Sequence, residues 1–256
     1  MIKNANLTNT WALACYAVDK YGVIVPSGPN YTLNPEYIPP NIKEIRACIE
    51  HGEDAIAQML DKKIPDLYPQ HDGLEQYINQ LTPGTNEYEH GRTFHYSYGL
   101  RLEEMFRPST EDFSDGYLYI RQLNFIAENL APFNKRMQAI TWIPEIDLPN
   151  TIVDENIKSV PCLQRVHPEN YYDKYYSLTL GWRSRDLFKA YMWNIDGLIN
   201  AIDTLIQAKR EQLGQSKLKL VQVVEFIDSL HVYEPDWDDT KKVPIDAKTI
   251  ANCLYI

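Results

Sequence analysis

The stretch GWRSRDLFKAYMWN, residues 181–194, marks the point where an expected β-strand passes into an expected long α-helix. Residues 175–186 alternate in a way that is typical of a strand. From about residue 185 to residue 212, apolar side chains recur at helical spacing instead. This change of period predicts a strand that leads directly into the longest helix of the chain.

Three polar residues, Arg183, Ser184 and Asp186, occupy this junction. Backbone N–H groups and the helix dipole at a helix start favour an anion, so the junction is a candidate anion site. Ordinary capping of the long helix by Ser184 explains the same residues equally well.

The flanking sequence predicts a mixture of helices and strands. Helical patterns cover residues 7–22, about 41–60, 72–84 and 118–133. Strand patterns cover residues 92–99, 136–144 and 218–237, the last ending in a turn. There is no glycine-rich phosphate loop and no βαβ series of the Rossmann kind. We therefore expect an α+β fold, with a mixed β-sheet packed with helices, in a single domain over residues 1–256.

The composition excludes several classes of protein. Hydrophobic residues make up 44% of the 256 residues, charged residues make up 23%, and the net charge is −10. This charge argues against a nucleic-acid binder. Because no run of about 18 apolar residues occurs, we expect no membrane span. The four cysteines are widely spaced, form no CxxC pair and suit a reducing cytoplasm better than disulfides or a metal site.

Three further stretches are candidates for chemistry. Lys135 and Arg136 begin an apolar strand pattern and could meet a phosphate, although a solvated strand end is the simpler explanation. Cys162, in VPCLQ, is either a small core residue or a nucleophile. His231 and Tyr233 alternate on one strand face, so both can reach one ligand.

Taken in order along the chain, these stretches resemble the thymidylate synthase family. The matching elements are YSYGLR, Arg-x5-Trp in RMQAITW, Pro-Cys in VPCLQ, Arg-Ser-x-Asp followed by Asn in RSRDLFKAYMWN, and His-x-Tyr in HVY. They span about residues 95–238, more than half of the chain. No single element is specific, but their common order is. The resemblance implies a thymidylate-synthase-like fold that dimerises through its sheet.

The resemblance implies a nucleophile and a phosphate site. Cys162 would attack C6 of a pyrimidine as a thiolate, because a ring carbon is a soft electrophile. Arg183 would lower the pKa of this thiol and bind phosphate together with Ser184. Lys135 and Arg136 would supply two more cations from the partner subunit, which implies a homodimer with shared active sites.

The other roles concern the base, the sugar and the folate. Asn194 would offer an acceptor to N3–H and a donor to O4 of uracil. Asp186 would meet the pterin of 5,10-methylenetetrahydrofolate, and His231 and Tyr233 would hold a sugar hydroxyl. The implied enzyme is a cytoplasmic one-carbon transferase that acts on a pyrimidine nucleoside monophosphate without a metal. Its product would carry a methyl or a hydroxymethyl group at C5.

The chain departs from the family pattern in several places. Leu163 replaces the usual His after Pro-Cys, and Lys135 replaces the first residue of an Arg-Arg pair. Tyr98 lies in YSYGLR and is a further catalytic candidate. The catalytic carboxylate is best matched by Glu75 in LEQYINQLTPGTN, with Glu87 and Glu89 as alternatives. The N-terminal phosphate-binding Arg and the usual Trp-bearing segment have no counterpart, which indicates a distant branch.

Two alternatives remain open. A cytosine-nucleotide 5-hydroxymethylase would carry Asp where this chain has Asn194, although Asp196 lies two residues away. A non-catalytic nucleotide-binding homolog would not need the thiol of Cys162. The residues do not distinguish ribose from deoxyribose, since both sugars carry the 3′-hydroxyl.

Overall fold

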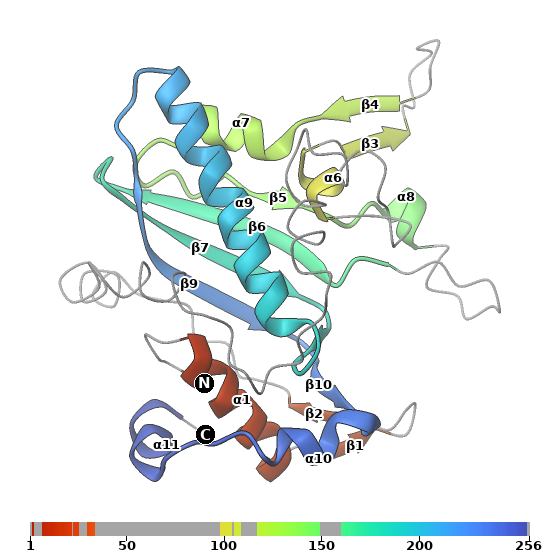
Figure 1. Ribbon diagram of the computed structural model, residues 1–256. Coiled ribbons are helices and arrows are strands. Elements are labelled where there is room, and N and C mark those ends of the chain that lie inside the picture. Colours follow the sequence, from red (N-terminus) through yellow and green to blue (C-terminus); the bar gives the residue numbers. More distant parts are fainter. Residues whose placement is uncertain are drawn as a thin grey trace. The chain divides into compact units, whose positions relative to one another are not determined.

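A computed structural model describes residue 2 and residues 7–21, 23–25, 30–33, 98–103, 105–108, 117–148 and 160–254 (Figure 1). These residues fall in two compact units. The first is drawn from Met1–His71, Trp182–Asp196 and Val221–Ile256, and the second from Asp72–Gly181 and Gly197–Leu220. Each unit is built from separated stretches of the chain. The single domain expected over residues 1–256 stays a prediction.

The first unit contains a four-stranded mixed sheet in the order β1-β2-β10-β8. The bounds of these strands are Val23–Val25, Asn30–Leu33, Leu230–Tyr233 and Arg185–Asp186. Strand β2 pairs antiparallel with β1 and β10, whereas β10 and β8 are parallel. The parallel pair matters for function because it aligns two segments that are far apart in the sequence.

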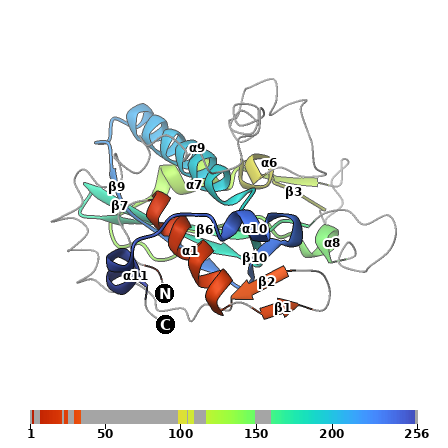
Figure 2. The same ribbon diagram turned by 60° about the horizontal axis from the view of Figure 1, so that its bottom comes forward.

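Helices accompany this sheet in the first unit (Figure 2). Helix α1 (Leu7–Tyr21) buries Trp11, whose indole N–H donates to the carbonyl of Leu187 at 2.9 Å. The ring of Trp11 also lies 5.7 Å from the ring of Phe188. After β10 the chain forms the 3-10 helix η2, α10 and α11, with the bounds Glu234–Asp236, Trp237–Thr240 and Ala247–Cys253.

The second unit is built on a sheet of order β5-β6-β7-β9. The last residue of β7 and most of β9 belong to the first unit. These strands are Ala139–Ile140, Leu163–Tyr171, Tyr175–Trp182 and Lys219–Ile227. The unit also holds the hairpin β3–β4 (Met105–Pro108 and Tyr117–Ile120). Its helices are α6, α7, α8 and the larger part of α9, with the bounds Tyr98–Glu103, Gln122–Asn129, Pro144–Asp147 and Tyr191–Gln212.

Within this unit, α9 packs on one face of strands β6 and β7 (Figures 1 and 2). The contact is largely apolar, and full burial of one such side chain stabilises a fold by about 1.5–3 kcal/mol. The buried apolar residues of α9 in this unit are Leu198, Ile199, Ile202 and Ile206. Polar bonds fix the position of the helix: Tyr176 donates to Asp203, and Gln207 both donates to and accepts from the backbone of Leu218.

The structure confirms the expected α+β class with a mixed sheet. Four local predictions were wrong. Residues 118–120, expected to begin a helix, belong to strand β4, and the helix is limited to Gln122–Asn129. Helix α9 begins at Tyr191 rather than near residue 185, because Arg185 and Asp186 pair with β10 as a strand. Tyr98 and the next residue open helix α6 instead of ending a strand. The strand expected over residues 136–144 is reduced to Ala139–Ile140.

A buried ion pair fastens α6 to α8. Both guanidinium nitrogens of Arg101 contact the carboxylate of Asp147, at 2.9 and 3.2 Å, and the Asp147 side chain is only 1% exposed. The same carboxylate accepts from the Ile143 N–H at 2.7 Å, and Arg101 donates to the carbonyl of Thr141. Together these bonds define the path of the chain from residue 141 to residue 147.

Replacing Asp147 should therefore destabilise the fold strongly. Asp147→Ala leaves the Arg101 guanidinium without its carboxylate in a dry site, and removing one partner of a buried pair costs about 3–5 kcal/mol. Urea unfolding measures this free energy. Asp238→Ala removes the exposed Asp238–Lys241 pair and should change it little, since exposed pairs contribute roughly 0–1 kcal/mol. Equal effects of the two variants would contradict this account.

Candidate active site

In the first unit, the pairing of β8 with β10 gathers the candidate residues. The Arg185 N–H donates to the Ser229 carbonyl at 2.8 Å, and the Leu187 N–H donates to the His231 carbonyl at 2.9 Å. This register places His231 beside Asp186 on the neighbouring strand. The Ser184 hydroxyl lies 3.5 Å from Nδ1 of His231, at the outer limit of a hydrogen bond. Two motifs more than forty residues apart thus meet in one cluster.

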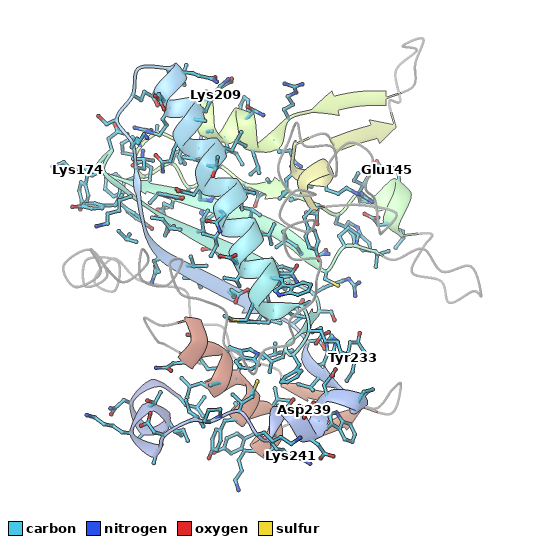
Figure 3. The ribbon with its side chains drawn as sticks, in the orientation of Figure 1. Glu145, Lys174, Lys209, Tyr233, Asp239 and Lys241 are labelled. Carbon is cyan, nitrogen blue, oxygen red and sulfur yellow. The ribbon has the colours of Figure 1, made fainter. Side chains whose placement is uncertain are left out.

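His231 is a buried imidazole in this cluster. Burial lowers its pKa below the ordinary value of 6.5, the nearby Arg183 acts in the same direction, and Asp186 opposes the change. The imidazole is consequently neutral at pH 7 and can accept or donate a hydrogen bond. Its ring lies 4.9 Å from the ring of Tyr233 in an edge-to-face contact, so the two share one strand face as predicted. Tyr233 is half-exposed near the end of β10 (Figure 3).

Asp186 combines two features. Its Oδ1 accepts hydrogen bonds from the N–H groups of Phe188 and Lys189, at 3.0 and 3.1 Å, and so shapes the turn that leads to α9. Burial raises the pKa of its carboxyl, although both N–H bonds and His231 act against this rise. The carboxyl therefore keeps a proton to higher pH than an exposed aspartate does.

Arg183, Ser184 and Asn194 complete the candidate residues of the first unit. Arg183 and Ser184 are half-buried and precede β8, so a cation and a hydroxyl donor are adjacent there. Capping of the long helix by Ser184 is excluded, because that helix begins only at Tyr191. Asn194 is 9% exposed and lies in the first turn of α9, where its N–H donates to the Ala190 carbonyl at 3.0 Å.

Cys162 belongs to the second unit. It is half-buried, forms no disulfide and directly precedes β6. The backbone on both sides is held in place: the Gln164 amide donates to the Pro161 carbonyl at 2.7 Å, and the Thr141 hydroxyl donates to the Leu163 carbonyl. The Thr141 N–H also donates to the carbonyl of Gln164 at 3.1 Å. Cys162 is thus a half-buried residue between backbone groups that are held by hydrogen bonds.

The remaining candidates of the second unit are less constrained. Lys135 and Arg136 are exposed in the turn after α7, where the Arg136 N–H donates to Oδ1 of Asn134 at 3.1 Å. Tyr98 is half-buried at the first position of α6. Glu75, with its alternatives Glu87 and Glu89, lies outside the described residues.

The sequence did not predict two features of these sites. Arg185 stands between Ser184 and Asp186 yet is only 2% exposed, and Arg101 and Asp147 hold the segment that contacts the backbone beside Cys162. The burial of Arg185 could have been predicted from strand alternation, which places its side chain on the other face of the strand from Ser184 and Asp186. No comparable pattern links Arg101 to Asp147. In the described part of the chain, no cluster of His, Cys, Asp and Glu could hold a metal ion, and no helix could cross a membrane.

The lowered pKa of His231 predicts a pH-dependent stability. As the pH falls through 6.5, the unfolded chain takes up a proton at this position before the folded protein does, so the free energy of unfolding falls. His231→Gln should remove this part of the pH dependence. Thermal or urea unfolding of parent and variant between pH 7.5 and pH 5.5 measures the difference. Parallel stability profiles for the two proteins would show that His231 is not held neutral.

Known proteins resemble the chain both in sequence and in fold. No family model matches the chain. A protein named "Putative thymidylate synthase" from Methanosarcina acetivorans is 30% identical over 172 residues, and equally named proteins from Methanosarcina barkeri and Methanosarcina mazei are 28% identical. The matched residues cover 66% of this chain and 65% of each relative, just under two thirds of the relatives' length.

The fold has a counterpart among solved structures. Thermostable thymidylate synthase A from Bacillus subtilis superposes with a TM-score of 0.54 at 14% identity, covering 92% of this chain and 83% of its own. At this identity the likeness concerns the fold. The chain is thus similar in sequence to proteins named putative thymidylate synthase, and it shares the fold of a solved thymidylate synthase.

Proposed function

We propose that the protein transfers a one-carbon unit from 5,10-methylenetetrahydrofolate to C5 of a uracil nucleotide, UMP or dUMP. The observation that carries the proposal is the cluster of Ser184, Asp186 and His231 formed by the parallel pairing of β8 and β10. Asn194, buried one helical turn into α9, adds an amide that suits the edge of a uracil ring.

The proposed nucleophile is Cys162. Its thiolate attacks C6 of the pyrimidine, a C–S bond forms, and the electrons of the C5–C6 double bond move toward O4 to give an enolate. C5 then becomes the carbon nucleophile that takes up the one-carbon unit. Loss of the C5 proton and expulsion of the thiolate restore the double bond. The partial exposure of Cys162 and the fixed backbone around it support this role.

The phosphate of the nucleotide is the proposed ligand of Arg183 and Ser184. A guanidinium binds phosphate oxygens in pairs, and the adjacent hydroxyl adds one donor. Lys135 and Arg136 are exposed in their own unit, which leaves them available for an anion bound by another subunit. We therefore include in the proposal a homodimer in which each subunit lends these two cations to its partner's site.

Asp186 is the proposed contact of the folate. A carboxyl fixed by two backbone N–H groups can form hydrogen bonds with a nitrogen-rich ring, which suits a pterin. When bound, the folate supplies the carbon at the oxidation level of formaldehyde. A methyl product would require the folate also to give up a hydride to that carbon, whereas attack of water there would give a hydroxymethyl group, so the exclusion of water would decide between them. The reaction is proposed for the cytoplasm, which fits the thiols of Cys15 and Cys162 being outside any disulfide.

Product analysis tests the proposal directly. The purified protein is incubated with methylenetetrahydrofolate and, in turn, UMP, dUMP, CMP and dCMP, and the nucleotides are examined by mass. A uracil nucleotide should gain the mass of a methyl or hydroxymethyl substituent. Conversion of cytosine nucleotides alone would favour the 5-hydroxymethylase alternative, and no conversion of any nucleotide would favour a binding protein.

Asn194→Asp should shift the base preference in this assay toward cytosine. A carboxyl group accepts from the N4 amino group of cytosine but cannot donate to O4 of uracil when ionised. Loss of a matched hydrogen bond in a buried site costs about 1–3 kcal/mol, so the ratio of kcat/KM for uracil over cytosine should fall roughly ten- to hundredfold. Asn200→Asp, later in the same helix, serves as the control. An unchanged ratio in Asn194→Asp would contradict the assignment.

Cys162→Ala should abolish turnover while nucleotide binding persists, because the phosphate and base contacts do not use the thiol. Calorimetry gives the nucleotide affinity and product analysis gives the rate. Cys15→Ala, at a fully buried thiol of α1, is the matched control and should keep its activity. A Cys162→Ala protein that retains about a tenth of the parent rate would rule out covalent catalysis by this residue.

A further inference from the structure

Arg185 is a buried cation in the first unit. Its side chain is 0% exposed, and its Nη1 lies 3.2 Å from Oε1 of Glu225 on β9. Its Nη2 donates to the Tyr191 carbonyl at 2.8 Å. The guanidinium carbon lies 3.9 Å from the ring centroid of Trp182 and 4.3 Å from that of Tyr191. Two aromatic faces, one carboxylate and one carbonyl therefore surround the charge.

Burying this ion pair in the core carries a large desolvation cost. Nε and Nη1 of Arg185 and Oε1 of Glu225 make no well-aligned hydrogen bond, although the ion pair itself is close. Desolvation of a buried pair commonly cancels its Coulomb attraction, and apolar residues of similar volume are often equally or more stabilising. Stability alone does not account for an arginine between two aromatic rings.

The contacts of Arg185 instead connect the elements that carry the candidate site. Its backbone belongs to β8, between Ser184 and Asp186, and its side chain reaches the first residue of α9. Tyr191 is also hydrogen-bonded to Glu225. Burial is the main cause that raises the pKa of its phenol well above the usual range, and the negative charge of Glu225 is the second. Arg185, Glu225 and Tyr191 thus form a closed set of contacts, and Asn194 lies in the helical turn that this set anchors.

We propose that Arg185 is a positioning residue, held in place by Glu225, Trp182 and Tyr191. It ties the strand segment that carries Ser184 and Asp186 to the first turn of α9, which carries Asn194. The inference rests on the proposed function, because it assigns these three residues to one nucleotide. Arg185 itself faces away from Ser184 and Asp186 by strand alternation and touches no substrate.

The test separates stability from geometry with the double variant Arg185→Leu/Glu225→Leu. Since both charges are removed together, the melting temperature should stay close to that of the parent. A misplacement of about 1 Å can cost roughly a hundredfold in rate, so kcat/KM should fall by roughly ten- to a hundredfold. The preference for uracil over cytosine nucleotides should fall with it, because Asn194 is no longer held in register. A stable double variant with parental kcat/KM and parental base preference overturns the proposal.

Two further variants complete the experiment. Arg185→Lys keeps the charge beside Glu225 but cannot also reach the Tyr191 carbonyl through a planar fork, so it should fold and lose at least about fivefold in kcat/KM. If the double variant does not fold, this result decides: a parental Arg185→Lys enzyme overturns the proposal. Arg210→Met is the matched control, because Arg210 is a 3% exposed arginine of the last turns of α9, beside the labelled Lys209 (Figure 3).

Arg210 donates to the Ser216 carbonyl at 2.6 Å and pairs with Asp173, far along the helix from Asn194. Arg210→Met should lower the melting temperature and leave kcat/KM and base preference unchanged. If Arg210→Met loses as much kcat/KM as the Arg185 variants do, the positioning role of Arg185 is overturned. A parent protein that binds no pyrimidine nucleotide in calorimetry overturns the proposed function and this inference with it. An active parent beside a fully active double variant overturns the inference alone.

Discussion

Two backbone hydrogen bonds between β8 and β10, Arg185 N–H to Ser229 and Leu187 N–H to His231, are the constraint on which the candidate site depends. They bring the segment that precedes helix α9 beside the beginning of β10, in parallel register. Because side chains alternate along a strand, this register decides which residues become neighbours. A shift by one position would replace Asp186 with Arg185 or Leu187 opposite His231.

Burial gives this cluster its electrostatic character. The largest cause of both pKa changes, the rise at Asp186 and the fall at His231, is the loss of water, and each change favours the neutral form of the group. The neutral imidazole of His231 can therefore act as a hydrogen-bond donor or acceptor rather than as a counter-ion. In the proposed function, Arg183 supplies the positive charge that a phosphate requires. Such a site suits a nucleotide, because the charged phosphate and the uncharged base and sugar can be bound by different side chains.

Much of the fold and of the candidate site could be predicted from the sequence, since strong local patterns survive folding. Strands β7, β9 and β10 lie in the segments predicted as strands, and the shared face of His231 and Tyr233 followed from alternation. The beginning of α9 was misplaced, because the helical pattern from residue 185 cannot show that Arg185 and Asp186 pair with a strand some forty-five positions later. Strand β6 was not predicted, because Pro168 and charged residues interrupt its alternation. The ion pairs Arg185–Glu225 and Arg101–Asp147 are long-range contacts without local signal.

The central claim is that the thiol of Cys162 forms a covalent bond with C6 of a uracil nucleotide. A 5-fluoropyrimidine nucleotide tests it most directly, because fluorine replaces the C5 proton whose loss would release the enzyme. The protein is incubated with methylenetetrahydrofolate and 5-fluoro-UMP or 5-fluoro-dUMP, denatured, and examined by intact mass and peptide mapping. The account predicts an added mass of one nucleotide plus one folate on the peptide that contains Cys162. An unmodified protein, or an adduct on Cys15 instead, would contradict it.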